Sequence, residues 1–369
     1  KRQVEAVWTW GLRAIFILAA LLGAAAGRLS AQAQGGIRVT GVQWAGLAPT
    51  EALPGTIDTI ARDDLAPLVG QTLDGPELAS VLARLTTRLQ QAGYPIAQVA
   101  ITPGDLQALV QGGLLKVTVL PGRVGKVAVL GNASGINDQR IERTASQALC
   151  PEGVGNDCLL TAAGLERMEL LLHDLPNLKL APIQLDAQQV EVGQTAVQLQ
   201  AERFGKPFQV YVGADNYGYP ASGQYRFSGG AMMSNLFGFG DVLRADLGVS
   251  NKGALSGAAE VSLPIGYDGL RGQVSYTRSQ YSLPENNVEG SADIFSAGLS
   301  YPIVRGLDAN WVAGLGASFI ESRQTVIGLA AFPPRDLYNA NLLLRRDSGD
   351  RALYLDKGFW TLAAAGTVG

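Results

Sequence analysis

An alternation of apolar and polar residues in the second half of the chain constrains the fold more than any other feature. In the clearest run, residues 243–250, the odd positions are apolar and the even positions are polar or small. Similar runs occupy residues 255–263, 270–277 and 295–303. Strands with one apolar and one polar face are typical of a transmembrane β-barrel, which has lipid outside and water inside. We therefore expect barrel strands beyond residue 204.

A soluble β-sandwich would also alternate, but two observations favour the barrel. Charged residues lie inside the runs, and Tyr and Phe residues lie near their ends, as in an interfacial aromatic girdle. The turns between the runs are short or rich in glycine, which predicts a meander of antiparallel strands. The charged residues that we expect to face the lumen are Arg244, Asp246, Glu260 and Arg271.

The N-terminus has the pattern of a secretory signal peptide. Lys1, Arg2 and Arg13 precede the apolar run at residues 14–27, and Ala31-Gln32-Ala33 has the small-x-small form of a cleavage site. A membrane-spanning helix would need about 20 apolar residues, and this run is shorter. We expect residues 1–33 to be removed on export. The formal net charge of −3 argues against nucleic acid as a partner.

Cys150 and Cys158 are the only two cysteines. An exported chain meets an oxidising compartment, which favours their pairing as a local disulfide. The alternative is a metal site, but two thiols and the single distant His173 do not complete a four-ligand set.

Two small α/β modules precede the alternating runs. In the first, we predict a strand at 37–42, helices at 64–69 and 76–92, and strands at 96–101 and 114–120. In the second, we predict a strand at 126–130, helices at 138–149 and 161–173, and strands at 178–185 and 190–201. Both modules have the order β-α-α-β-β.

These segments resemble the two-partner secretion transporters, which export haemolysins and filamentous adhesins. Residues 89–99 followed by 115–127 resemble the first polypeptide-transport-associated (POTRA) domain of that family, through Gly93-Tyr94 and through Gly122-Arg123-Val124-Gly125. Residues 165–178 resemble the helix of the second POTRA domain that ends in a Leu-Pro step. The segments 227–241, 259–265 and 299–306 resemble the first strands of the family's barrel.

The resemblance implies an α+β pair of tandem POTRA domains at 34–122 and 123–204, followed by an antiparallel barrel at 205–369. Residues 206–369 hold about eight strands, fewer than the family's barrel, so we expect this barrel to be incomplete. The alternative is an eight-stranded barrel that is complete in itself. Val304-Arg305-Gly306 begins like the family's lumen loop, but Leu307 stands where the family has Tyr. We interpret this segment as the end of an early strand.

The function implied by the resemblance is export across the outer membrane. The POTRA domains would lie in the periplasm and capture an unfolded exoprotein that bears an N-terminal secretion domain, for export through the barrel. The edges of their sheets could pair with an extended client, although the domains could also be simple spacers. Outer-membrane lipid and the barrel-assembly machinery, which inserts barrels, are further expected partners.

Two other functions remain open at this point. The first is a barrel-assembly factor of the same superfamily, which inserts other membrane proteins. The second is a surface enzyme or small porin with an N-terminal extension. The sequence has no nucleophile constellation, phosphate loop or metal-ligand cluster, so we predict no enzymatic activity and no cofactor.

Overall fold

The computed structural model describes residues 36–47, 53–155, 158–188, 190–283, 287–327, 332–347 and 360–368. The signal peptide predicted at residues 1–33 lies outside these residues. Contacts divide the chain into two compact units. Of the described residues, the first unit comprises those up to 128 together with 149–165 and 182–199, and the second comprises 129–148, 166–181 and those from 200 onwards.

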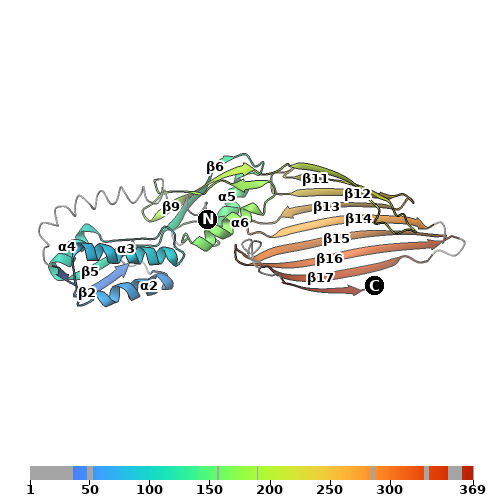
Figure 1. Cartoon of the computed structure of the whole chain (residues 1–369). Coiled ribbons are helices and arrows are strands. Elements are labelled where there is room, and N and C mark those ends of the chain that lie inside the picture. Colours follow the sequence, from blue (N-terminus) through green and yellow to red (C-terminus); the bar gives the residue numbers. More distant parts are fainter. Residues whose placement is uncertain are drawn as a thin grey trace. The chain divides into compact units, whose positions relative to one another are not determined.

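The first module is a small sheet covered by helices (Figure 1). Strand β5 is central and pairs with β2 in parallel and with β4 antiparallel. The elements in chain order are β1 (Ile37–Arg38), β2 (Gly41–Ala45), α2 (Gly55–Leu65), η1 (Ala66–Leu68), β3 (Thr72–Leu73), α3 (Gly75–Gln91), β4 (Gln98–Ala100), α4 (Pro103–Gly112) and β5 (Leu114–Leu120).

Helix α3 provides much of the core of this module. It begins with a capping box, in which the Asp74 carboxylate accepts from the Glu77 N–H and the Glu77 carboxylate accepts from the Asp74 N–H. Leu85 and Leu89 on its inner face are fully buried, as is Leu115 on β5. Burial of a leucine side chain contributes about 1.5–3 kcal/mol, so this helix face holds the module together.

The helices of the first module differ from the prediction at two places. Helix α2 runs over Gly55–Leu65, and only its end and the following 3-10 turn cover the short helix predicted at 64–69. Helix α4 was not predicted. Its signals were present, because Thr102 caps its N-terminus, Pro103 follows at the first turn and Gly113 ends it in the left-handed conformation.

The second module has the predicted strand and two helices, but the strand predicted at 178–185 is divided into two short strands. It comprises β6 (Arg123–Asn132), α5 (Asp138–Leu149), α6 (Ala162–His173), β7 (Leu178–Leu180), β8 (Gln184–Asp186) and β9 (Gln194–Arg203). β9 lies between β6 and β7 and also pairs with β8. Cys150 and Cys158 form a disulfide, with their Cα atoms 5.4 Å apart.

Replacing both Cys150 and Cys158 by alanine is expected to lower the free energy of unfolding of this module by about 2.5 kcal/mol. The bond closes a loop over a sequence separation of 8, and a cross-link of this span restricts the unfolded chain. Urea titration of the oxidised protein and of the double variant would measure the difference. Equal midpoints for the two proteins would contradict the expectation.

The rest of the chain is a nine-stranded antiparallel sheet in which each strand pairs with its neighbours in sequence (Figure 1). The predicted meander is confirmed. Its strands are β10 (Phe208–Asp215), β11 (Arg226–Ser234), β12 (Val242–Ser250), β13 (Leu255–Pro264), β14 (Arg271–Leu283), β15 (Val288–Arg305), β16 (Asn310–Val326), β17 (Arg335–Asp347) and β18 (Trp360–Val368).

The register gives this sheet two faces of different chemistry. The face that carries Val210, Leu243, Leu247 and Val274 is called the apolar face, and the face that carries Arg244 and its register neighbours is called the polar face. Val210, Leu247 and Val274 are each more than half exposed. Exposed apolar residues in such numbers suit contact with lipid. In the part of the chain that the structure describes, no helix is long and apolar enough to span a membrane.

Candidate functional site

Two glycines of the POTRA motif, Gly93 and Gly122, join the first module to the second. Their contacts all lie within the first compact unit. The Gly93 carbonyl accepts from the Ala162 N–H at 2.9 Å, and the Gly122 carbonyl accepts from the Leu160 N–H at 3.0 Å. Gly122 has a φ of +83°, and a Cβ there would lie 2.3 Å from Ile96 Cγ1. Only glycine fits this turn without strain.

The remaining motif residues complete the same joint. The Arg123 N–H donates to the Gly193 carbonyl at 3.0 Å, and a Cβ on Gly125 would lie 2.4 Å from Gln194 Oε1. The Tyr94 N–H donates to the Leu89 carbonyl at 3.2 Å, and the Tyr94 side chain packs on the core of the first module. The motif therefore shapes a tight connection, and we assign it no direct contact with a client.

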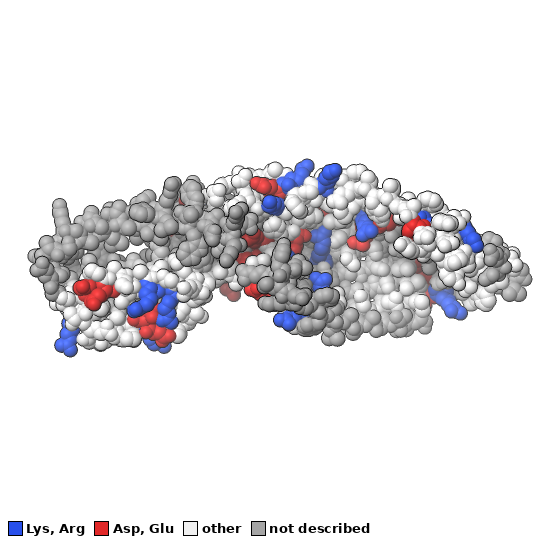
Figure 2. All heavy atoms as spheres, viewed as in Figure 1, with Lys and Arg blue, Asp and Glu red and all other residues white. Residues whose placement is uncertain are grey.

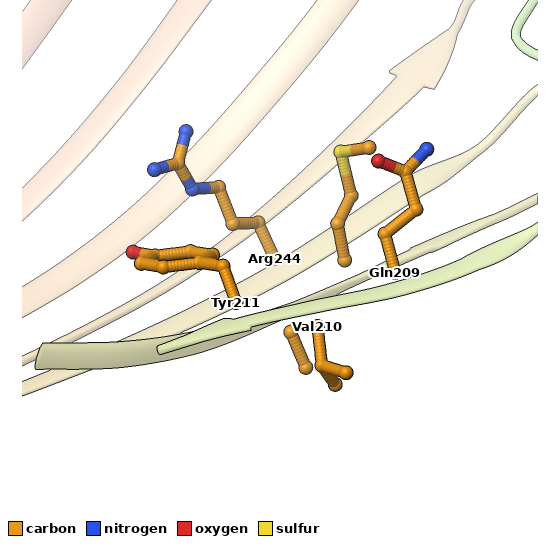
Figure 3. Close-up of a pocket in the computed structure, with 6 residues that line it drawn as sticks. Gln209, Val210, Tyr211 and Arg244 are labelled. Carbon is orange, nitrogen blue, oxygen red and sulfur yellow. The ribbon is translucent and has the colours of Figure 1, made fainter. Parts of the chain in front are cut away.

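The polar face carries a charged cluster on β10 and β12. Arg244 Nε donates to Asp246 Oδ2 at 2.7 Å, and the Tyr211 hydroxyl donates to the same carboxylate. Gln209, Tyr211 and Arg244 project to one side of the sheet and Val210 to the other (Figure 3). Gly230 lies opposite Tyr211, and a Cβ there would lie 2.5 Å from the ring. The missing side chain lets the tyrosine lie across the strand.

The other two candidate lumen residues, Glu260 and Arg271, also lie on the polar face, but in different register rows. Glu260 is the direct register neighbour of Arg244. Arg271 lies at the end of its strand, where Nε donates to the Ser262 hydroxyl at 2.7 Å and an NH2 group donates to the Gly240 carbonyl at 3.0 Å. The structure thus brings Arg244, Asp246 and Glu260 together and places Arg271 in a separate network.

That second network holds the turn between β11 and β12. Asp241 is fully buried, and its carboxylate accepts from the backbone N–H groups of Leu236, Phe237 and Phe239 at 2.9–3.4 Å. Three donors on one carboxylate fix the turn at residues 235–241. The turn in turn meets the helical part of the second unit, because the Asn137 N–H donates to the Gly238 carbonyl at 2.9 Å.

Three successive turns at this end of the sheet contact the helical part of the same unit, and we call these contacts the junction. Asn235 Nδ2 in the first turn donates to the Pro176 carbonyl at 2.6 Å. The second turn contributes Tyr267 and Asp268, and the third contributes Arg305 and Leu307. Their partners are Arg143 for the Tyr267 hydroxyl at 3.0 Å, Arg167 for the Asp268 carbonyl at 3.3 Å, Asp174 for Arg305 at 2.9 Å and Glu166 for the Leu307 N–H at 2.7 Å.

The junction is made largely of charged groups. The Arg305 side chain is only 13% exposed and donates two hydrogen bonds to the Asp174 carboxylate. The Arg140 guanidinium lies over the Tyr267 ring, 4.8 Å from its centre. Burial lowers the pKa of Arg140, and the nearby Tyr267 opposes this shift. Because such groups are destabilised when they lose their partners, the helices and turns are expected to stay together.

The described residues hold the chain's single histidine, His173, and no metal site. No group of three or more His, Cys, Asp and Glu side chains there could hold a metal ion. His173 ends α6 and is exposed. Acidic and basic side chains lie beside one another rather than in large fields of one sign (Figure 2).

The junction and the role of Asp241 are not predicted from the sequence. The predicted strand end at residues 304–306 is confirmed, because β15 ends at Arg305. Nothing in a single sequence indicates which helix a turn will contact. The sequence signal for the role of Asp241 is its position directly after the Gly-rich segment Gly238-Phe239-Gly240, where an aspartate can accept from backbone N–H groups of a turn. Leu307, which departs from the family's loop motif, belongs to the third turn of the junction.

Two family models match the chain. Residues 54–122 match the ShlB-type POTRA domain, and residues 193–324 match the haemolysin secretion/activation protein ShlB/FhaC/HecB. Among curated proteins, the heme/hemopexin transporter protein HuxB of Haemophilus influenzae is 27% identical over 256 residues, which are 67% of this chain and 43% of HuxB. The outer membrane transporter CdiB-2 of Burkholderia pseudomallei is 27% identical over 241 residues, which are 63% of this chain and 38% of CdiB-2.

Two solved structures share the fold. CdiB from Escherichia coli has a TM-score of 0.65 at 22% identity, covering 92% of this chain and 60% of that chain. CdiB from Acinetobacter baumannii has a TM-score of 0.60 at 16% identity, covering 91% and 63%. The chain thus spans less than half of the curated relatives that it matches and about 60% of the solved structures.

These findings confirm the predicted fold class, which is POTRA structure followed by an antiparallel sheet like that of an outer-membrane barrel, with no pairing of β10 to β18 among the described residues. The predicted location, the outer membrane with POTRA structure in the periplasm, is confirmed as well. The findings also confirm the resemblance from which both were predicted. The two matched segments, residues 54–122 and 193–324, show that this chain is similar to the ShlB/FhaC/HecB haemolysin secretion/activation proteins in both its POTRA part and its strand sheet.

Proposed function

We propose that this protein exports an unfolded exoprotein across the outer membrane, along the polar face of its strand sheet. The observation that carries the proposal is the joining of a ShlB-type POTRA domain to a sheet with one apolar and one polar face. HuxB and CdiB-2, which it resembles, are transporters by name. The exoprotein class that we propose is the haemolysin or adhesin type with an N-terminal secretion domain.

Sheet edges supply a means of capturing such a client. β2 and β4 flank β5, and within the described residues each pairs with another strand on one side only. An extended segment could add to either edge through main-chain hydrogen bonds, which do not require a folded client. We further propose that residues 123–204 form a second POTRA domain, in keeping with their strand, helix and strand order.

The residues of the polar face are proposed to line the path of the client. Arg244, Asp246, Glu260 and Tyr211 supply both signs of charge and an aromatic ring within one patch. Such a surface forms weak contacts with many extended sequences and holds none of them tightly. Transport of this kind would need no nucleotide and no bound cofactor. We propose that the barrel-assembly machinery inserts the protein.

Co-expression of the full-length protein with an exoprotein that bears an N-terminal secretion domain is expected to release that exoprotein into the medium. An exoprotein lacking this domain is expected to remain in the periplasm and to be degraded there. Immunoblots of the two fractions give the ratio of exoprotein in the medium to exoprotein in the periplasm. The matched control is the same exoprotein in cells that express no transporter.

The same cells test the alternative of a barrel-assembly factor. Loss of the protein would then reduce the amounts of other outer-membrane barrels, while release of the exoprotein would be unchanged. That pair of results would overturn the export proposal.

A further inference from the structure

The apolar face changes its chemistry abruptly across one register step. Tyr276, Phe295, Phe319 and Tyr338 are direct register neighbours on β14 to β17 and form one aromatic row on this face. The ring centres of Tyr276 and Phe295 are 4.7 Å apart, and those of Phe319 and Tyr338 are 5.1 Å apart. An aromatic row of this kind is typical of a membrane interface.

The next register row on the same face is charged. It comprises Arg278, Asp293, Glu321 and Asp336, which lie two residues from the aromatic row and further from the junction. Arg278 pairs with Asp293 at 3.0 Å, and Arg323, one row beyond, donates to Glu321 at 3.0 Å. Charges on the lipid-facing side are too costly to lie within hydrocarbon. The hydrocarbon must therefore end between these two rows.

The opposite border of the apolar face lies near Trp311. Arg346 packs over its ring at 5.7 Å, and Tyr301 lies one step nearer the sheet centre on β15. The residues between Trp311 and Phe319 span about 26 Å along the strand, or about 20 Å along the membrane normal for a strand tilted by about 40°. This length approaches the apolar height of an outer-membrane barrel, about 25 Å.

The apolar band does not follow one register row across the sheet. On β12 and β13 it continues through Leu247, Val249 and Leu255, which occupy the same rows as Arg278 and Gln280 on β14. Tilted strands in a barrel require such a drift, because a register row climbs relative to the membrane plane. The drift supports the assignment of this face to lipid.

We propose that Arg278 and Arg323 bind the phosphate groups of the outer-leaflet glycolipid, lipopolysaccharide. The two side chains are 51% and 62% exposed. Both belong to the apolar face and lie toward the strand ends that are remote from the junction. A guanidinium has a fork of donors that suits phosphate. Asp293 and Glu321 each hold one guanidinium in place while leaving part of it open to the lipid headgroups.

The test uses the full-length protein in phosphatidylcholine vesicles that contain lipid A. Retention of lipid A after detergent extraction, measured by mass spectrometry, is expected to fall about tenfold in the double variant R278Q/R323Q, as two charge-assisted contacts are removed. Lipid A without its phosphates is expected to be retained equally poorly by both proteins. Folding should be preserved, because both arginines are exposed and Asp293, which is 14% exposed, keeps its hydrogen bond from the Tyr276 hydroxyl at 2.6 Å.

Arg226 provides the matched control. It is 50% exposed and pairs with an aspartate, Asp215, at 2.9 Å, but it lies on the polar face. R226Q is expected to retain lipid A like the unchanged protein. Equal retention by R278Q/R323Q and the unchanged protein, an equal loss in R226Q, or equal retention of lipid A with and without phosphates would each overturn the proposal.

Discussion

Replacing Asp241 by alanine is expected to destabilise the sheet by about 3 kcal/mol, since three backbone donors lose an acceptor that is itself fully buried. The Asp241 side chain is fully buried and closes the turn that joins β11 to β12. Without it, the turn and its contacts with Asn137 and Pro176 lose their shape. The measurement is the fraction of protein that runs as the compact, heat-modifiable form on unboiled gels, followed through a urea titration.

Two further variants separate the hydrogen bonds of Asp241 from its mere size. Asp241→Asn keeps one acceptor oxygen and is expected to lose less stability than the alanine variant. Asp268→Ala changes an aspartate in the next turn, whose contact with Arg167 uses a backbone carbonyl that alanine retains. This control is expected to behave as the unchanged protein. A D241A protein with an unchanged urea midpoint would show that the turn does not depend on this carboxylate.

Reversing the charge of Arg305 is expected to open the third contact of the junction. In Arg305→Glu, a largely buried carboxylate would face Asp174, and loss of such a pair costs about 3 kcal/mol even at the lower end of the usual range. The lower end applies because Asp174 is itself 45% exposed. Limited proteolysis between α6 and the sheet should become faster, and release of a co-expressed exoprotein should fall.

The exchange variant Arg305→Glu with Asp174→Arg tests whether charge pairing is the cause. It is expected to restore most of the protease resistance and most of the export. Arg62→Glu is a matched control, because Arg62 and Asp58 form an exposed pair within one helix turn, and such pairs contribute about 0.3–0.5 kcal/mol. If the exchange variant remained as defective as R305E, the Arg305 side chain would act through packing rather than charge.

Local patterns were sufficient to predict most elements of this protein. Helix α5 has the predicted bounds, and α6 differs from its prediction by one residue. The alternation at residues 243–250 placed Arg244 and Asp246 on the face that lies opposite Leu243 and Leu247. These predictions succeeded because period and capping are properties of neighbouring residues.

Two features were not predicted from the sequence, helix α4 and the junction. Helix α4 buries fully only Leu109 and begins with Pro-Gly, so its apolar pattern in the sequence is weak. The junction could not be predicted because its partners come together only after folding. Arg305 and Asp174 are separated by 131 residues. In the sequence, each of them looks like an ordinary charged surface residue.

The order of the turns along the chain has a kinetic consequence. Every ladder in the sheet joins strands that are neighbours in sequence, which favours the growth of one hairpin after another. The helix contacts close over much longer loops, with separations of 59 residues for the first turn, 101 for the second and 141 for the third. During folding, the helices would therefore gain one attachment with each added hairpin. If the sheet stopped folding after its first hairpins, the later helix contacts would not form. The helices would then remain accessible to proteases that degrade incompletely folded chains.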